Sequence, residues 1–260
     1  MNKKISIITI NYNNLSGLKK TVESVVNQTW KEFEYIVIDG GSIDGSEAYI
    51  DSQSAHINYW VSQPDKGIYN AMNKGILKAS GEYLLFLNSG DHFCSDSSLQ
   101  ENQNRIATHD LIYFNLNVID ENNTFLKKYP DQLSFSYFTK DTLPHPATFI
   151  RASLFSKVGM YDESLKIVSD WKFFLESICK FNCSYIRVDE TLTTFYLDGL
   201  SSDPRNKVLI FEEKQKILKS GFQAFIQDRD ELVELKTILS NLRESRKIKI
   251  LVKLGILNKF

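Results

Sequence analysis

The chain has 260 residues, of which 42% are hydrophobic and 12% aromatic, and its 31 Lys+Arg and 32 Asp+Glu give a formal net charge of -1. This length and composition exclude a disordered chain and a collagen-like repeat, and they suffice for an α/β domain with a hydrophobic core. The near-zero charge argues against a non-specific nucleic-acid binder, which needs a clearly basic domain. We therefore expect no nucleic-acid partner.

The cysteines and the apolar runs predict a cytoplasmic protein. The 3 cysteines form no CxxC pair, which is typical of reduced thiols. The apolar run near the N-terminus is too short for a signal peptide, and no stretch approaches the ~18 apolar residues that a membrane-spanning helix needs.

Strands alternate with helices in the first part of the chain. Runs rich in β-branched and aromatic residues predict strands at 5–10, 33–38, 57–61 and 82–87. Apolar residues at spacings of three and four predict helices after the first three strands, the last over 67–79 with Asp65 as its N-cap. This order predicts βαβ units and a mostly parallel α/β sheet. The face that the last helix should bury consists of Ile68, Met72, Ile76 and Ala79.

The pattern changes near residue 110. Short runs at 110–120, 123–130, 147–151 and 184–199 predict antiparallel strands, interrupted by a helix over 171–179. A helical tail follows Pro204. We expect a domain at 1–203 with halves 1–110 and 111–203, and a helical extension at 204–260.

Polar residues follow the predicted strands of the first half. Asn11, Asp39, the stretch 64–66 and the stretch 88–91 each come directly after a strand. Ligands bind at the carboxyl ends of strands in such sheets, so these groups should line one site. The alternatives are structural: a turn at Asp39, a helix cap at Asp65 and a bare turn at 88–91.

The absence of several well-known motifs disfavours some enzyme classes for this site. No GxGxxG, no P-loop lysine and no GxSxG occur, which disfavours a nicotinamide dehydrogenase, an NTPase and a serine hydrolase. Carboxylates and amides suit a nucleotide bound by its base and ribose, with its diphosphate carried by Mg²⁺ or Mn²⁺ on oxygen ligands such as Asp91.

Three segments in order carry a family resemblance. ISIITINYNN, VIDGGSIDGS and SQPDKGIYNAMNKGILKASGEYLLFLNSGD resemble the inverting family-2 glycosyltransferases of the GT-A fold. The version here is similar to the bacterial enzymes that build O-antigen, capsule or colanic-acid repeat units. The resemblance covers about residues 4–200. It implies a Rossmann-like half that binds a nucleotide-diphospho-sugar, most simply a UDP-sugar, and a mixed central sheet.

The resemblance also implies roles for single residues. Thr9, Asn11 and Asp39 would line the pocket for base and ribose, with Asp39 accepting from a base N–H. Asp65 and Lys66 would lie near the ribose and the diphosphate.

The stretch Asn88, Ser89, Gly90 and Asp91 stands where the family has its D-x-D metal motif. Because Asn88 replaces the first acid, Asp91 is the only sure carboxylate ligand. We expect the protein to hold the divalent metal, Mn²⁺ or Mg²⁺, weakly.

The second half contains the expected catalytic base. An inverting transferase needs a group that takes the proton of the acceptor hydroxyl, and a carboxylate suits this role. Asp170, at the start of the helix in the second half, matches the family's position; alternatively it is only a first-turn acid favoured by the helix dipole. His145 matches a histidine of relatives and either contacts the diphosphate or acceptor or hydrogen-bonds in the core. The segment 196–202 resembles a lid over the donor.

The tail predicts contacts outside the domain. Residues 243–260 hold six Lys+Arg and one Glu, a net charge of +5, which leaves -6 on residues 1–242. This basic, amphipathic end could lie on an anionic membrane at the inner face or dock on its own protein. A stripe of leucines from Leu232 to Leu242 could pack on the domain or form a homodimer. The resemblance implies a carbohydrate acceptor, such as a polyprenyl-diphosphate-linked sugar.

Two other functions stay open at this point. A sugar-nucleotide pyrophosphorylase shares a similar core but needs a glycine- and arginine-rich N-terminal loop, which Asn11–Asn14 is not. A catalytically silent nucleotide-sugar-binding scaffold would not need Asp39, Asp91 and Asp170 together.

Overall fold

The computed structural model describes residues 5–120 and 123–258. The first part of the chain contains β1 (Ile5–Asn11), α1 (Leu15–Val26), β2 (Phe33–Asp39), α2 (Ser46–Ser52), η1 (Ser54–His56), β3 (Tyr59–Ser62), α3 (Ile68–Lys78), β4 (Tyr83–Phe86), β5 (His92–Phe93), α4 (Ser98–Asn102) and η2 (Gln103–Arg105). The middle part contains β6 (Leu111–Asp120), β7 (Asn123–Lys127), α5 (Phe135–Phe138), η3 (His145–Ala147), β8 (Thr148–Arg151), α6 (Ser153–Lys157), α7 (Ser169–Cys179) and β9 (Tyr185–Tyr196). The last part contains η4 (Pro204–Asn206), α8 (Lys207–Gly221), α9 (Gln223–Glu244) and α10 (Arg246–Lys253).

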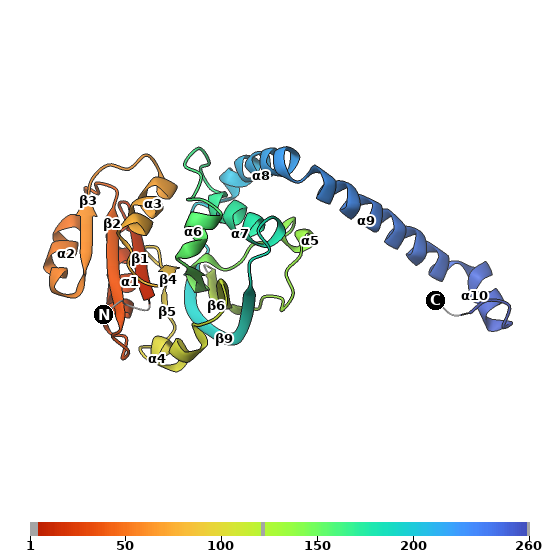
Figure 1. The fold of residues 1–260 in the computed structure, drawn as a ribbon, viewed down its shortest axis with the longest axis horizontal. Coiled ribbons are helices and arrows are strands. Elements are labelled where there is room, and N and C mark those ends of the chain that lie inside the picture. Colours follow the sequence, from red (N-terminus) through yellow and green to blue (C-terminus); the bar gives the residue numbers. More distant parts are fainter. Residues whose placement is uncertain (1–4, 121–122, 259–260) are drawn as a thin grey trace. The chain divides into compact units, whose positions relative to one another are not determined.

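One mixed sheet organises the domain. Its strands run in the order β3-β2-β1-β4-β8-β6-β9-β5, with β7 paired to β6. The strands β3, β2, β1 and β4 are mutually parallel, and β1 and β2 lie side by side with every residue buried (Figure 1). Burial on both faces explains why these two strands are continuously apolar rather than alternating. The expected α/β fold with a mixed central sheet is confirmed.

The middle part is less uniformly antiparallel than the sequence predicts. Strand β8 is antiparallel to β4 and to β6, and β7 and β5 are antiparallel to their partners. Strands β6 and β9, however, run parallel, with a register shift near Asn115. The intervening segment contains α7, which provides the crossover that a parallel pair requires.

Helix α3 buries a different face from the predicted one. Met72 is buried as expected, but Ile68, Ile76 and Ala79 are only half-buried, and Tyr69 and Asn73 are buried instead. A Cβ on Gly75 would lie 2.5 Å from Ile8 Cγ2, so the helix approaches β1 closely along its glycine. This close approach and the hydrogen bonds of Asn73 determine how the helix is rotated about its axis. The spacing of hydrophobic residues alone does not predict this rotation.

The chain divides into two compact units, Met1–Glu213 and Lys214–Phe260. The division falls inside α8. Glu213, in the first unit, accepts hydrogen bonds from the backbone N–H groups of Lys166 and Ile167 at 2.7 and 3.1 Å. These bonds explain why the first turns of α8 belong with the domain.

In the described part of the chain beyond Phe222, the second unit is helical and largely exposed. Helix α9 has no buried residue, and α10 carries Arg246, Lys247, Lys249 and Lys253 on eight residues. Among the described residues, no helix combines the length and apolarity needed to cross a membrane.

Replacing Gly81 tests the close packing at the start of β4. A Cβ there would lie 2.6 Å from the Ser6 backbone nitrogen and 2.7 Å from the Ile5 carbonyl carbon, neither of which can rotate away. We expect Gly81→Ala to lower the free energy of unfolding by about 1–3 kcal/mol, the usual cost of overpacking. Urea unfolding measures this change. Gly199→Ala is the control because nothing lies within 4 Å of its Cβ position; equal stability of both variants would contradict the prediction.

Candidate active site

Polar side chains meet at the carboxyl ends of the parallel strands. Asn11 lies opposite Asp39 in the β1–β2 register, and Asp39 lies opposite Ser62 in the β2–β3 register. The loop 88–91 follows β4, which pairs with the other side of β1. The strand register therefore places these groups at one edge of the sheet, where open α/β sheets bind ligands.

Asp39 is completely buried and ties three strands together. Its Oδ1 accepts from Asn11 Nδ2 at 2.7 Å and Ser42 Oγ at 2.6 Å, and its Oδ2 accepts from Ser62 Oγ at 2.6 Å and the Ser42 N–H at 2.9 Å. Burial acts to raise the pKa of Asp39, but the hydrogen bonds from Ser42, Ser62 and Asn11 outweigh burial and hold this pKa below its ordinary value. Because both oxygens are engaged, a base N–H can reach Asp39 only if a serine hydroxyl turns away.

Thr9 and Asn11 stand on β1 but differ in their hydrogen bonding. Thr9 is fully buried, and its hydroxyl donates to the Leu87 carbonyl at 2.8 Å and lies 3.0 Å from the Tyr35 hydroxyl. Thr9 thus braces the strand ends from inside the sheet. Asn11 Oδ1 is buried without a hydrogen-bond partner.

The loop after β4 is held by α1. Thr21 Oγ1 donates to the Asp91 carbonyl at 2.7 Å and accepts from the Gly90 N–H at 3.0 Å. Gly90 has φ 114°, a value that requires glycine. Asn88 Oδ1 and Ser89 Oγ are, like Asn11 Oδ1, buried without a partner.

These unpartnered oxygens gather at one edge of the sheet. A buried polar atom without a hydrogen bond costs about 1–3 kcal/mol, so such atoms usually have a protein, water or ligand partner. Of the 4 that occur in the described part of the chain, that of Asn11 lies at the end of β1, and those of Asn88 and Ser89 lie in the loop after β4. The edge can therefore accept hydrogen bonds from water or from a polar ligand.

Asp91 is a buried carboxyl that forms no ion pair with a Lys, Arg or His side chain in the described part of the chain and receives only a backbone hydrogen bond from Asn88. It is 8% exposed, and burial, followed by the negative charge of Asp198, raises its pKa to about 8. Asp198 follows β9 and lies in the segment expected to act as a lid. A cation is the partner that such a pair of carboxylates lacks.

The donor set fits a hard divalent cation bound only in part by the protein. Asp91 and Asp198 offer carboxylate oxygens, the ligand type that Mg²⁺ and Mn²⁺ prefer. Within residues 5–120 and 123–258, no group of three or more His, Cys, Asp or Glu side chains is arranged to hold a metal. The remaining ligands would have to come from a substrate and water.

Asp170 lies in the first turn of α7 and faces α3. The Tyr69 hydroxyl contacts both Asp170 Oδ1, at 2.8 Å, and the Ile167 carbonyl. Burial, followed by the charge of Asp170, raises the pKa of Tyr69 well above its ordinary value, so Tyr69 stays a donor. Because α3 begins just after β3, this bond brings Asp170 to the same end of the sheet as Asp39.

Glu213 fixes the loop before α7. Besides its bonds to Lys166 and Ile167, its carboxylate accepts from the Val168 N–H at 3.3 Å. Three backbone donors at one carboxylate hold the loop on which the position of Asp170 depends.

His145 belongs to the core. It is 9% exposed, its ring stacks on Phe86 at 4.8 Å, and its Nε2 lies 2.9 Å from the Tyr161 hydroxyl. Burial lowers the pKa of His145, although the charge of Asp170 acts to raise it, so the imidazole is neutral near pH 7. Of the two predicted roles, hydrogen bonding in the core is the one that this position favours.

Asp65 does not cap α3. The N-cap is Gly67, and Asp65 instead forms an ion pair with Lys74 on the second turn of the helix. Lys66 is exposed, and its backbone N–H donates to Asn70 Oδ1 at 3.2 Å. The ion pair keeps the Asp65 carboxylate beside Gly40, whose Cβ position is 3.3 Å from it.

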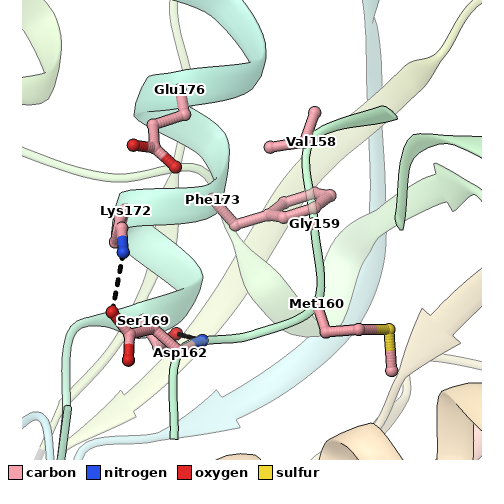
Figure 2. A pocket seen from close by; sticks show the side chains of 8 residues that line it. All are labelled: Val158, Gly159, Met160, Asp162, Ser169, Lys172, Phe173 and Glu176. Atoms are coloured by element: carbon pink, nitrogen blue, oxygen red, sulfur yellow. Dashed lines mark hydrogen bonds and ion pairs between the residues drawn. The ribbon is translucent and has the colours of Figure 1, made fainter. Parts of the chain in front are cut away.

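Figure 2 shows the side chains that line an open hollow beside α7. Two of them, Lys172 and Asp162, form an ion pair of 2.7 Å, and Ser169 Oγ accepts from the Asp162 N–H (Figure 2). Ser169 directly precedes Asp170, so the hollow opens beside the start of α7. It is lined by Val158, Gly159, Met160, Asp162, Ser169, Lys172, Phe173 and Glu176.

Sequence reasoning missed three residues that the structure brings to this edge. Tyr69 stands inside the quoted SQPDKGIYN segment, but only the fold shows that it reaches Asp170. Asp198 lies in the predicted lid segment, where its charge affects Asp91. Glu213 carries no sequence signal, because its partners are backbone groups more than forty residues away.

The sequence matches a known family and named relatives. The family model described as "Glycosyl transferase family 2" matches residues 6–159. An uncharacterized glycosyltransferase of Mycobacterium tuberculosis is 34% identical over 203 residues, which cover 76% of this chain and 77% of that protein. A PGL/p-HBAD biosynthesis glycosyltransferase of Mycobacterium bovis is 29% identical over 65% of this chain and 67% of that protein.

Solved structures share the fold at low sequence identity. TarS of S. aureus, in complex with UDP, superposes with a TM-score of 0.61 at 18% identity over 74% of this chain and 60% of that chain. A mannosyltransferase of Pyrobaculum calidifontis, in complex with GDP-Man and Mn²⁺, has a TM-score of 0.58 at 11% identity over 76% of this chain and 58% of that chain. This chain thus spans less than two thirds of either solved chain and shares their GT-A fold.

The raised pKa of Asp91 predicts a pH-dependent stability in the presence of a chelator. Between about pH 4 and pH 8 the folded protein binds the Asp91 proton more tightly than the unfolded chain does, so stability falls as pH rises, by at most about 1.4 kcal/mol per unit. Asp91→Asn removes the pH-dependent contribution of this carboxyl to the free energy of unfolding. We expect the variant to be the more stable protein at pH 8 and the difference to shrink toward pH 4, measured by urea unfolding. Asp51→Asn, at an exposed carboxylate, is the control; a constant difference across the pH range would contradict the prediction.

Proposed function

The chain belongs to glycosyl transferase family 2, and on this premise we propose that it transfers a sugar from a nucleotide-diphospho-sugar to an acceptor hydroxyl with inversion at the anomeric carbon. The observation that carries the proposal is the contact between Tyr69 and Asp170 at 2.8 Å. It places a carboxylate from the second half of the domain at the edge where the strands of the first half end. A donor bound at this edge would present its anomeric carbon between the two halves.

Asp170 is the proposed general base. One of its oxygens is held by Tyr69, which leaves the other to accept the proton of the acceptor hydroxyl. As that oxygen forms its bond to the anomeric carbon, the bond from this carbon to the diphosphate breaks, and the nucleoside diphosphate leaves with the bonding electrons. Tyr69 and Glu213 act as positioning residues, because they orient Asp170 and its loop without meeting the substrate.

The donor's diphosphate would be neutralised beside Asp91. Asp91 and Asp198 are the proposed protein ligands of a divalent cation, which as a Lewis acid stabilises charge on the leaving diphosphate when it is bound. The burial of Asp91 near the charge of Asp198 supports this assignment, since a cation would offset both the burial of the carboxylate and the repulsion between the two charges.

Base and ribose would bind over Asn11 and Asp39. The unpartnered oxygens of Asn11, Asn88 and Ser89 can accept from donor hydroxyl and N–H groups. Thr9 braces this pocket, and Asp65 and Lys66 border it near the ribose and diphosphate. A UDP-sugar is the first candidate donor because the solved TarS chains carry UDP and UDP-GlcNAc, and a GDP-sugar is the second because the mannosyltransferase carries GDP-Man.

Asp170→Asn tests the proposed base. We expect the turnover number to fall by about 10²–10⁴, the usual contribution of a general base. UDP binding with Mn²⁺, measured by calorimetry, should not change, because the proposed base acts on the acceptor hydroxyl and not on the nucleotide. The activity readout is nucleoside diphosphate released from UDP-GlcNAc or GDP-Man, with water as the acceptor.

Tyr69→Phe is the matched positioning variant. It keeps the ring and removes the bond to Asp170, so turnover should fall less than in Asp170→Asn while the KM for the donor stays the same. Full turnover in Asp170→Asn would remove Asp170 from the role. Release of pyrophosphate from UTP and a sugar phosphate would indicate a pyrophosphorylase, and neither product a silent scaffold.

The proposed acceptor is a sugar on a lipid carrier, reached from the membrane surface by α10. This helix carries four basic residues, and its apolar Ile250 is 57% exposed. Basic residues close to an anionic bilayer contribute about 1 kcal/mol each. A cytoplasmic enzyme docked at the inner face of the membrane would then meet a polyprenyl-diphosphate-linked acceptor.

Changing Lys247, Lys249 and Lys253 to Gln tests the docking. We expect the partition onto vesicles containing phosphatidylserine to fall on the order of a hundredfold, measured by co-sedimentation. Unchanged binding of this variant would exclude α10 from the role. The control changes three exposed lysines of the first unit, Lys78, Lys128 and Lys140.

A further inference from the structure

Helix α9 carries an apolar stripe that is about half exposed in the described chain. The stripe leucines occur at spacings of three, four and three residues, which is one face of a helix. Each of them is between 38% and 62% exposed, and α9 contains no buried residue. They are Leu232, Leu235, Leu239 and Leu242.

The spacing is that of a coiled coil. If Leu232 and Leu239 take position a of a heptad, Leu235 and Leu242 take position d, so both seam positions are apolar over two heptads. We propose that α9 pairs with α9 of a second copy of this chain, in parallel, through these stripe leucines. The pairing would bury on both copies the face that one copy leaves in water.

The charges beside the stripe favour a second copy of α9 as the partner and a parallel orientation of the two helices. Glu231 takes position g and Lys236 position e of the next heptad. Two parallel copies bring g of one helix against e of the other, so Glu231 meets Lys236 of the second copy. An antiparallel pair would place the e positions together, and these hold the basic residues Arg229, Lys236 and Arg243 and no acid.

The net charge of α9 also argues against an anionic lipid surface as its partner. α9 contains five Asp+Glu and three Lys+Arg, a net charge of -2, whereas α10 contains four Lys+Arg and no acid. An anionic bilayer attracts α10 and repels α9. The two exposed helices of the second unit therefore suit different partners.

One position limits the strength of the pairing. Asp228 stands at the d position that precedes Leu232, where two parallel copies would bring two carboxylates together. The dimer should therefore dissociate on dilution, and Asp228→Leu, which completes the seam, should tighten it.

Sedimentation velocity of the full chain tests the proposal. Over about 1–100 µM protein we expect a reversible shift from one chain of 30.0 kDa to twice that mass. Leu235→Lys should raise the dissociation constant about tenfold or more, and Asp228→Leu should lower it by a similar factor. Thr237→Lys, at the exposed f position of the same helix, is the matched control and should leave it unchanged.

A charge variant tests the direction. Lys236→Glu places an acid opposite Glu231 in a parallel pair and should weaken it, but it would relieve repulsion and strengthen an antiparallel pair. Adding Glu231→Lys to Lys236→Glu exchanges the two charges and should restore the parallel dimer.

The proposal fails if the chain stays monomeric up to about 100 µM, or if Leu235→Lys and Thr237→Lys dissociate alike. A trimer that the stripe variants abolish would keep self-association and overturn the two-copy stoichiometry. Loss of vesicle binding in Leu235→Lys, with no dimer in solution, would assign the stripe to lipid and overturn it. Donor hydrolysis by each variant separates these outcomes from failure of the proposed enzyme activity.

Discussion

Burial of carboxylates at the ends of parallel strands is the constraint on which the site depends. Asp39 and Asp91 are both buried there, and the protein treats their charges in opposite ways. Hydrogen bonds from neighbouring residues lower the pKa of Asp39, so its charge is stabilised within the fold. Asp91 receives only a backbone hydrogen bond from Asn88, which burial and the charge of Asp198 outweigh, so its pKa rises. The Asp39 carboxylate therefore holds the strand ends together. The ionised form of Asp91 is destabilised by burial and by Asp198, and a bound divalent cation would stabilise it.

The proposed catalytic edge is assembled from segments that are distant in the sequence. Tyr69 on α3 reaches Asp170 on α7, and Glu213 on α8 fixes the loop that leads to Asp170. Through these two contacts, α3 and α8 both fix the start of α7, where Asp170 lies. If Asp170 is the base, as proposed, these two contacts leave it little freedom to turn away, which is the preorganisation that general-base catalysis needs. The same contact at Glu213 explains why the compact domain includes the first turns of α8.

The near-neutral total charge is the sum of unlike parts. Residues 243–260 carry +5 and the remainder -6. Within the second unit the division is sharper, because α9 is acidic with an apolar seam while α10 is basic and amphipathic. Apolar seams with flanking opposite charges suit another helix, and basic amphipathic helices suit an anionic surface. One short helical region thus has features that suit both the proposed self-association and the proposed membrane attachment.

Local pattern determined the strands β1 and β2, the alternation with helices, and the order of polar groups along the strand ends, because burial on both faces leaves a continuous apolar run. The family resemblance named Asp91 and Asp170, whose roles remain predictions. The sequence pattern wrongly predicted Asp65 as the cap of α3 and part of the face that α3 buries. The ion pair of Asp65 with Lys74 and the close approach of Gly75 to β1 are tertiary contacts that residue spacing does not predict. Only the tertiary structure decided that Asp39 is saturated, that Asp198 lies near Asp91, and that Tyr69 meets Asp170. These facts depend on distances between remote segments, which the packing of the sheet and helices sets.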